Sequence, residues 1–215
     1  MKERGMIFNA EMVRAILDGR KTQTRRTVKP QPDEDGLVKV INGPWVDTSE
    51  RNYRCPFGDV GDRIWVRETF QGPLFDYEQM EAYLEDSSRF EKPEFCQYAA
   101  DGGHRPEYQD ADDNLRHGWR PSIHMPRWAS RILLEITNVR VERLNSIHDV
   151  DAMREGIQNL TTCSHADFGI PGVVNAQHPV RAFQLLWESI YGADNWLANP
   201  WVWVIEFKRV EGGAA

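Results

Sequence analysis

The chain has 215 residues, a length that suits one domain with a long insertion. Hydrophobic residues make up 40% of it and charged residues 27%, and no run of about 18 apolar residues occurs, so we expect neither a disordered chain nor a membrane protein. Three cysteines lie far apart, which excludes a disulfide framework and is typical of a reducing compartment. The first residues lack the apolar core of a signal peptide, so the predicted location is cytoplasmic.

The net charge of −7 is distributed unevenly along the chain. Residues 71–118 hold twelve acidic and four basic side chains, a net charge of −8. Residues 1–30 carry a net charge of +5, and residues 119–143 carry +3. If the two basic segments meet in space, they form a local anion-binding face on an acidic protein. A mixed, solvated surface is the alternative interpretation.

The first half of the chain predicts one helix and two strands. An apolar stripe predicts a helix over residues 10–18, with Asn9 as its N-cap and Gly19 as its left-handed end. The polar run 21–27 is rich in threonine and predicts a strand. A Gly-Asp turn at 58–62 precedes an alternating strand over 63–67.

The second half predicts an α+β fold. Residues 76–95 suit a short helix and residues 130–144 a long or paired strand. The run 146–149 has the form of a capping box and predicts a helix over 149–155 that Gly156 closes. An amphipathic helix over 179–191 and a strand over 201–209 follow. This order has no regular βαβ repeat and favours a compact, mostly antiparallel sheet or barrel.

Several common catalytic and ligand-binding motifs are missing from the sequence. It has no glycine-rich nucleotide or phosphate loop and no nucleophile elbow. It also lacks a zinc-ligand pattern and the signature of the zinc deaminases. We therefore expect neither a cofactor nor a metal.

The most unusual run is Gly19-Arg20-Lys21-Thr22-Gln23-Thr24-Arg25-Arg26. One interpretation is a solvated basic strand or a phosphate contact. The other is a catalytic site, because like charges and partial burial lower a lysine pKa and make it a base near neutral pH.

The pattern Gly19-x-Lys21-x-x-x-Arg25 after a short amphipathic helix resembles the signature of the ASCH domain, a relative of the PUA RNA-binding fold. Three further segments agree with it in order: the turn and strand 61–66, the helix end 152–156 and the closing strand 204–207. Segment 120–127 is similar to ASCH proteins common in phage and prophage genomes. Segment 71–118 has no counterpart in the minimal domain.

The resemblance implies a small PUA-like β-barrel with flanking helices. It also implies a metal-independent amidohydrolase that acts on N4-acetylcytidine or a related modified pyrimidine. Lys21 would be the base, Thr24 the nucleophile and Glu155 the acid. Since residues three apart face opposite sides of a regular strand, this site requires Lys21 to lie in the turn before the strand.

Substrate-binding roles are expected for a further set of basic and aromatic residues. Arg25 or backbone amides are expected to hold the oxyanion. Trp65 either stacks on a base or packs in the sheet, and Arg127 either contacts phosphate or lies in a solvated loop. The predicted substrate-binding set is Arg20, Arg25, Arg26, Trp65, Arg67 and Arg127. The partner is then a modified nucleoside or single-stranded RNA. The alternative function is a module that binds RNA or another single strand, or a ribonuclease.

Residues 1–215 are predicted to form one domain, with 71–118 inserted as a lid or rim beside the site. The 48 inserted residues are close to the lower limit for independent folding, and their apolar side chains are interspersed with acids. An acidic rim repels long polyanions and affects a neutral nucleoside little, so it favours a small substrate.

Overall fold

The computed structural model describes residues 1–41, 43–109, 114–162 and 165–210. These residues form an α+β structure, as predicted. The helices are α1 (Ala10–Leu17), α2 (Met80–Glu85), α3 (Asp149–Arg154), α4 (Pro179–Tyr191) and α5 (Ala193–Leu197). The strands are β1 (Glu3–Ile7), β2 (Gln23–Thr27), β3 (Val38–Lys39), β4 (Trp45–Val46), β5 (Asn52–Tyr53), β6 (Arg63–Arg67), β7 (Phe70–Gln71), β8 (Gln97–Tyr98), β9 (Glu107–Gln109), β10 (Leu115–His117), β11 (Leu133–Arg143), β12 (Gln158–Asn159), β13 (Phe168–Ile170), β14 (Val174–Ala176) and β15 (Trp201–Arg209).

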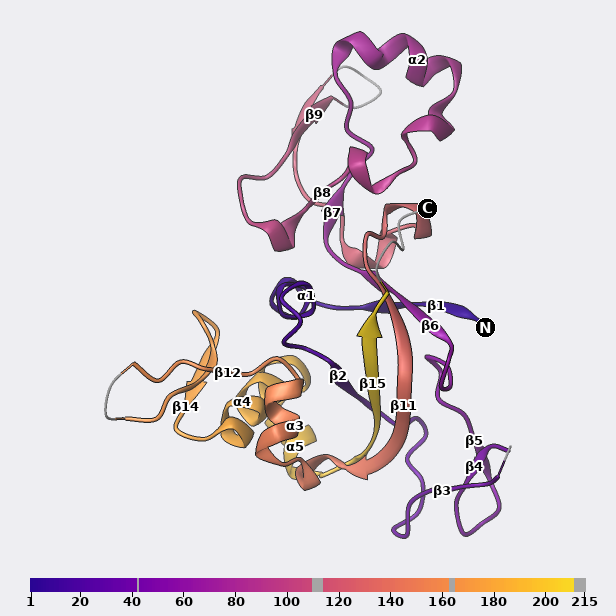
Figure 1. The fold of residues 1–215 in the computed structure, drawn as a ribbon, viewed down its shortest axis with the longest axis vertical. Coiled ribbons are helices and arrows are strands. Elements are labelled where there is room, and N and C mark those ends of the chain that lie inside the picture. The colour runs from indigo at the N-terminus through magenta and orange to yellow at the C-terminus, as the bar shows by residue number, and fades with distance from the viewer. Residues whose placement is uncertain (42, 110–113, 163–164, 211–215) are drawn as a thin grey trace.

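A five-stranded sheet in the order β1-β6-β11-β15-β2 organises the molecule (Figure 1). Strand β1 runs parallel to β6, and the other neighbours in the sheet are antiparallel. Helices α3, α4 and α5 gather beside β2 and β15 (Figure 1). Since β2 lies at the edge of the sheet, it is paired on one side only.

The described strands do not close into a barrel, because the edge strands β1 and β2 are not paired with each other. Side chains join these edges in place of a strand ladder. The Arg26 guanidinium on β2 donates a hydrogen bond to the Ile7 carbonyl on β1 at 2.7 Å and lies over the Phe8 ring. The sheet is therefore open in its hydrogen bonding and bridged by side chains.

Two hydrophobic cores lie on opposite faces of the sheet. Strand β15 alternates between them, since Trp203, Ile205 and Phe207 belong to the first core and Val202 and Val204 to the second. The first core also contains α1, and the second contains α3, α4 and α5. Strand β15, the neighbour of β2 in the sheet, therefore contributes to both cores.

Most predicted elements are present, with two notable departures. Helix α4 and strand β15 have the predicted bounds. The capping-box prediction was wrong: His148 is the N-cap of α3 and makes no side-chain cap bond, while Ser146 ends a 3-10 helix. Asp149 and Asp151 in the first turn of α3 stabilise that helix end through its dipole. Strand β1 was not predicted from the sequence.

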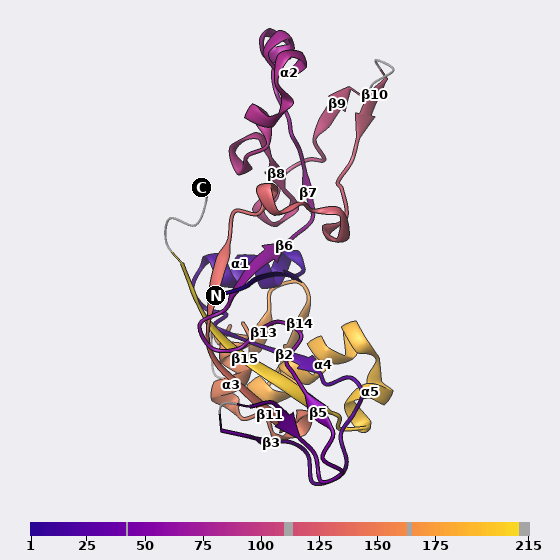
Figure 2. The same cartoon turned by 90° about the vertical axis from the view of Figure 1, so that its right-hand side faces the viewer.

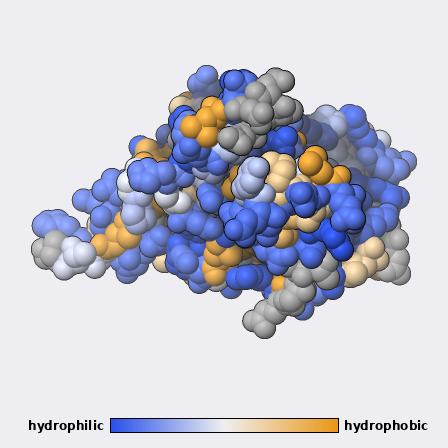
Figure 3. All heavy atoms as spheres, turned by 90° about the horizontal axis from the view of Figure 1, so that it is seen from above, coloured by the Kyte–Doolittle hydropathy of each residue, from blue (hydrophilic) through white to orange (hydrophobic). Residues whose placement is uncertain are grey.

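Residues 71–118 extend from the sheet along the long axis of the molecule (Figures 1 and 2). Their distal part holds an aromatic cluster in which Phe75 stacks on Tyr83 at 4.3 Å and Phe90 packs beside both. Seen from this end, the surface is mainly hydrophilic with small hydrophobic patches (Figure 3). The segment meets the rest of the chain at α1, where the Arg14 guanidinium donates to the Ala100 carbonyl at 3.0 Å.

Among the described residues, no helix is long and apolar enough to cross a membrane.

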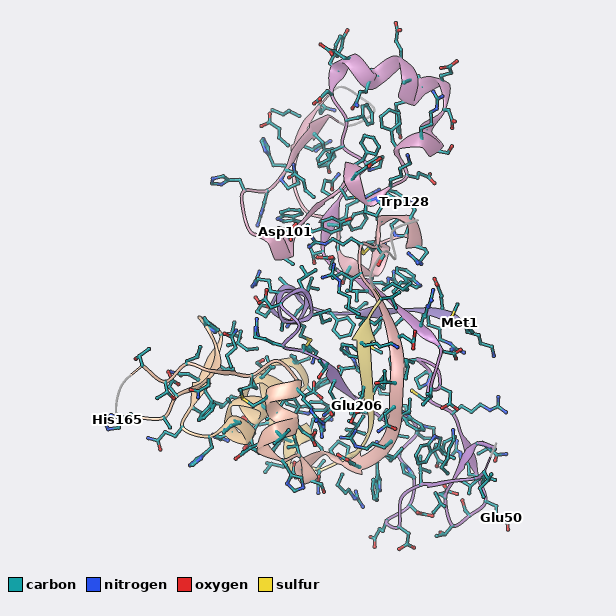
Figure 4. All side chains as sticks on the ribbon, in the orientation of Figure 1. Met1, Glu50, Asp101, Trp128, His165 and Glu206 are labelled. Carbon is teal, nitrogen blue, oxygen red and sulfur yellow. The ribbon has the colours of Figure 1, made fainter. Side chains whose placement is uncertain are left out.

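Arg131 connects the base of this segment to the main sheet. Its guanidinium contacts both carboxylate oxygens of Glu68, at 3.0 and 3.1 Å, and both of Asp101, at 2.8 and 2.7 Å. It also lies 3.9 Å from the centre of the Tyr98 ring. Figure 4 shows Asp101 at this junction. Burial raises the pKa of the Glu68 carboxyl, and Arg131 opposes that shift.

Arg131→Met should therefore destabilise the protein by about 3 kcal/mol, because it leaves the Glu68 carboxylate buried and without its cation. For a chain of this size we expect the thermal midpoint to fall by about 6 to 12 °C. Arg127→Met is the control, since Arg127 forms an exposed pair with Glu3 at 3.0 Å and its loss should change stability by no more than about 0.5 kcal/mol. Equal melting shifts in the two variants would contradict this prediction.

Candidate active site

Lys21 lies in the turn between α1 and β2, where the catalytic interpretation requires it. Helix α1 ends at Leu17, and Gly19 adopts the left-handed conformation with φ of 73°. The backbone N–H of Lys21 donates to the Ala15 carbonyl at 2.9 Å, two residues before β2 begins. Lys21 therefore precedes the part of the chain in which side chains alternate between the two faces of β2.

Glu155 comes from the C-terminal end of α3. Its backbone caps that helix, and Gly156 follows with φ of 108°, a conformation that favours glycine. A Cβ atom at Gly156 would lie 3.2 Å from the Ala15 Cβ and 3.6 Å from the Lys21 Cβ. Glycine at this position lets the end of α3 approach the α1–β2 turn closely.

Lys21 and Glu155 form a buried ion pair. The Lys21 Nζ donates to the Glu155 Oε2 at 2.7 Å and to the Glu155 backbone carbonyl at 2.8 Å. The two residues are 2% and 4% exposed. Burial lowers the pKa of Lys21, the Glu155 carboxylate raises it, and the guanidinium groups of Arg26 and Arg25 lower it further. The net direction is downward, which brings the amine closer to use as a base.

Arg25 supports this pair from the opposite side of the carboxylate. Its Nη1 contacts the Glu155 Oε1 at 3.2 Å, and its Nη2 contacts Glu142 and Asp151, each at 3.2 Å. Arg140 continues the network by donating to Glu142 at 2.5 Å and pairing with Glu206, which Figure 4 labels on β15. The Arg25 guanidinium is buried and has three carboxylate partners, so its charge is balanced within the chain.

A small cavity follows the free edge of β2, between α1 and α4. Its lining combines the three successive residues of β2 with the end of α3, one residue of α1 and an apolar stripe of α4: Thr24, Arg25, Arg26, Glu155, Met12, Phe183, Leu186, Trp187, Ile190 and Tyr191. Its volume is about 20 Å³, room for about one water molecule. A pyrimidine can enter only if a wall moves.

Arg26 and Tyr191 close the solvent side of this cavity. The Arg26 Nη1 contacts the Tyr191 hydroxyl at 3.4 Å, and the Tyr191 ring packs on Trp187 at 4.4 Å. Tyr191 is 37% exposed, is the last residue of α4 and precedes Gly192. Apolar residues of α1 and α4 form the other walls, and of these Ile190 is also exposed, at 44%. Tyr191 lies at the end of α4 and is held to Arg26 by one long hydrogen bond, so we expect it to move most readily.

Tyr191→Ala should therefore widen the cavity and admit larger substrates. If the site hydrolyses N4-acylcytidines, we expect kcat/KM for N4-benzoylcytidine to rise about tenfold relative to N4-acetylcytidine. Tyr191→Phe keeps the ring and loses only the weak hydrogen bond to Arg26, so it should keep the wild-type preference. An unchanged preference in Tyr191→Ala would show that another wall limits substrate size.

Four predicted site residues, Thr24, Arg25, Arg26 and Glu155, line this cavity, and Lys21 lies outside the lining and contacts Glu155. The four other predicted site residues also lie outside the lining. Arg20 pairs with Asp18 at 2.8 Å and donates to the Gly156 carbonyl at 3.2 Å. Trp65 and Arg67 share one face of β6, with the Arg67 guanidinium over the indole ring. Arg127 pairs with Glu3. Substrate contacts by these four residues stay predictions.

No described residue of segment 71–118 lines the cavity. The segment contacts α1 at Ala100, whereas Met12 of α1 reaches the cavity. Its function as a lid or rim stays a prediction.

Sequence reasoning missed two of the three acidic partners of Arg25, Glu142 and Asp151, and the position of the apolar wall. Asp151 had a signal, since it lies four residues before Glu155 in a predicted helix and therefore shares its face. Glu142 had none, because it meets Arg25 across 117 residues of sequence. The stripe on α4 was predicted from its periodicity, but its position beside Thr24 depends on tertiary packing.

No group of three or more histidine, cysteine, aspartate or glutamate side chains in the described part of the chain is arranged to hold a metal ion. Comparison with known proteins finds no matching family model, no matching curated protein and no matching solved structure.

Proposed function

We propose that this chain hydrolyses the N4-acyl amide of a cytosine nucleoside or a related modified pyrimidine. The observation that carries the proposal is the 2.7 Å contact between the Lys21 amine and the Glu155 carboxylate, beside a cavity that Thr24 lines. Membership of the ASCH family and a PUA-like relationship of the main sheet are parts of the same proposal. They rest on the motif resemblance around Lys21.

The Lys21–Glu155 pair supplies a base and an acid from one shared proton. Moving that proton from Nζ to Oε2 converts the ion pair into a neutral amine and a carboxylic acid. Burial favours the neutral amine of Lys21, because its charged form loses solvation there and its pKa is lowered. In the neutral form, Lys21 accepts a proton and Glu155 donates one, as amide hydrolysis requires.

The protons then balance over the whole reaction. The Thr24 hydroxyl gives its proton to Lys21 and attacks the acyl carbon, while Glu155 protonates N4 and the C–N bond breaks. An acyl ester on Thr24 and a free amine on the base remain. Water next gives a proton to Glu155 and attacks the ester, and Lys21 returns a proton to the Thr24 oxygen. The acyl group leaves as a free carboxylic acid. Lys21 is again a neutral amine, and Glu155 is again protonated.

This scheme predicts a bell-shaped pH dependence of kcat/KM. The active form holds one proton on the pair, so activity falls when a second proton binds at low pH and when the last one leaves at high pH. Since the pKa of Lys21 lies below its usual 10.5, the alkaline fall should be centred below 10.5. The measurement is kcat/KM from about pH 5 to 10.5. Activity that rises steadily to the top of this range would contradict the shared proton.

Turnover of defined substrates tests the proposed function. Purified protein with N4-acetylcytidine should release cytidine and acetate, and we expect the rate to persist in EDTA. Chromatography of both products gives the measurement. No cytidine from N4-acetyl-, N4-propionyl- or N4-benzoylcytidine would refute the proposal.

Binding of single-stranded RNA has less support. The Arg67 guanidinium already donates to the backbone carbonyls of Ser122 and Ile123. Arg127 is similarly paired with Glu3, so these side chains are less available to phosphates. Anisotropy of a labelled oligonucleotide that falls steeply with salt would restore this second function.

A further inference from the structure

The free edge of β2 points specific backbone groups into the cavity. In an antiparallel pair, alternate residues direct both N–H and C=O toward the partner strand. The Thr22 carbonyl and the Val28 N–H point toward β15, since the first accepts from Phe207 N–H and the second donates to the Trp201 carbonyl, each at 2.9 Å. The register between them has no shift. The even-numbered residues of β2 therefore face β15.

The odd-numbered residues of β2 consequently turn their backbone groups outward. Arg25 is the central one, paired in register with Val204 and flanked by Thr24 and Arg26, which also line the cavity. Within residues 1–41, 43–109, 114–162 and 165–210, no hydrogen bond to the Arg25 backbone N–H or carbonyl is found outside the sheet ladder. Its guanidinium is already held by three carboxylates. The Arg25 Nε is buried and has no hydrogen-bond partner among the described residues, so residue 25 offers a ligand its outward backbone groups and this one guanidinium N–H.

The walls beside this edge suit a flat ring. Met12 on α1 packs against the first core, and Phe183 and Trp187 on α4 belong to the second core on the other face of the sheet. All three line the cavity, so a ring placed edge-on to β2 has a thioether on one face and aromatic side chains on the other.

We propose that the outward N–H and C=O of Arg25 recognise the pairing edge of a cytosine-type base, in a slot between Met12 and the aromatic side chains of α4. The backbone N–H donates to N3 and the carbonyl accepts from N4–H, so one residue satisfies neighbouring positions of the base. Thr24 and Glu155 line the same cavity as this backbone edge. The inference rests on the proposed function for its ligand class.

Ligand analogues test the recognition without relying on turnover. Calorimetry should show wild-type protein binding cytidine at least about tenfold more tightly than 3-deazacytidine, which lacks the N3 acceptor, or uridine, which exchanges donor and acceptor. Tyr191→Ala is measured in parallel, so that a closed cavity cannot hide binding. Equal affinities for the three nucleosides, or no binding of cytidine by either protein, would overturn the inference.

A matched pair of variants isolates the backbone N–H. Arg25→Ala and Arg25→Pro both lose the guanidinium, but only proline loses the donor, and an edge strand tolerates proline where its N–H points outward. In folded samples we expect Arg25→Pro to bind cytidine at least about fivefold more weakly than Arg25→Ala. Thr27→Pro removes an outward N–H from a residue that does not line the cavity, so its affinity should match wild type. Equal binding by Arg25→Ala and Arg25→Pro would refute the assignment of the N–H, and if neither folds, the analogue series decides.

The two proposals fail in different ways. Selective binding of cytidine without release of cytidine from N4-acylcytidines would refute the hydrolase and retain the base slot. Hydrolysis with equal affinity for cytidine and 3-deazacytidine would refute the slot and retain the hydrolase.

Discussion

Lys21→Met should lower kcat/KM for N4-acetylcytidine by at least about 100-fold, the usual scale for loss of an acid–base group. Methionine has a similar length and fills the buried position, but it has no nitrogen to accept the Thr24 proton. Lys21 is 2% exposed and its Nζ has no described partner except Glu155, so no neighbouring amine is placed to replace it. Initial rates of cytidine release give the measurement.

An exposed lysine provides the matched control. Lys208 pairs with Glu135 at 2.9 Å on the surface of the sheet, and Lys208→Met should leave kcat/KM unchanged. Melting curves of both variants separate lost chemistry from lost folding. If folded Lys21→Met hydrolyses the substrate at the wild-type rate, Lys21 is not the base.

Glu155→Gln should also lower kcat/KM by at least about 100-fold, because the amide cannot protonate the leaving nitrogen. Glutamine retains an oxygen that can accept the Lys21 hydrogen bond, so the local geometry changes little. The residual activity should have a different pH dependence. Without a shared proton, only a neutral Lys21 is required, so the alkaline fall disappears and the rate rises with pH.

Loss of the carboxylate also shifts the titration of Lys21 in a defined direction. Glu155 raises the pKa of Lys21, so its removal lowers that pKa further, and the rise in residual activity should be centred below 10.5. Glu135→Gln removes an exposed carboxylate and should keep both the rate and the bell shape. A bell-shaped profile that survives in Glu155→Gln would assign the acid to another group.

Elements with a strong local pattern were predictable from the sequence. Helix α4 repeats its apolar residues over thirteen positions, and β15 begins with five consecutive apolar and aromatic residues, so both had the predicted bounds. Strand β1 has two charged residues and a glycine among its five, and its alternation is too weak to detect. Its parallel pairing with β6 is a tertiary feature.

The candidate site was predictable only in part, because several of its contacts are tertiary and leave no local pattern in the sequence. Lys21, Thr24 and Glu155 were selected through a motif resemblance. The structure places Lys21 in the turn before β2, as required because residues three apart on one strand face opposite sides. The α4 wall and the network around Arg25 depend on which segments meet at the edge of β2. Glu142, Asp151 and Arg25 come from three separate elements, and no local spacing encodes their contact.

The most direct measurement concerns Thr24 as the nucleophile. Wild-type protein is mixed with N4-acetylcytidine, quenched in acid within the first turnover and digested for mass spectrometry. We predict one acetyl group on the peptide that contains Thr24, and none in Thr24→Val, whose cytidine release should fall at least about 10⁴-fold. Release of cytidine by Thr24→Val at the wild-type rate, with no acetyl group on the wild-type Thr24 peptide, would contradict the account.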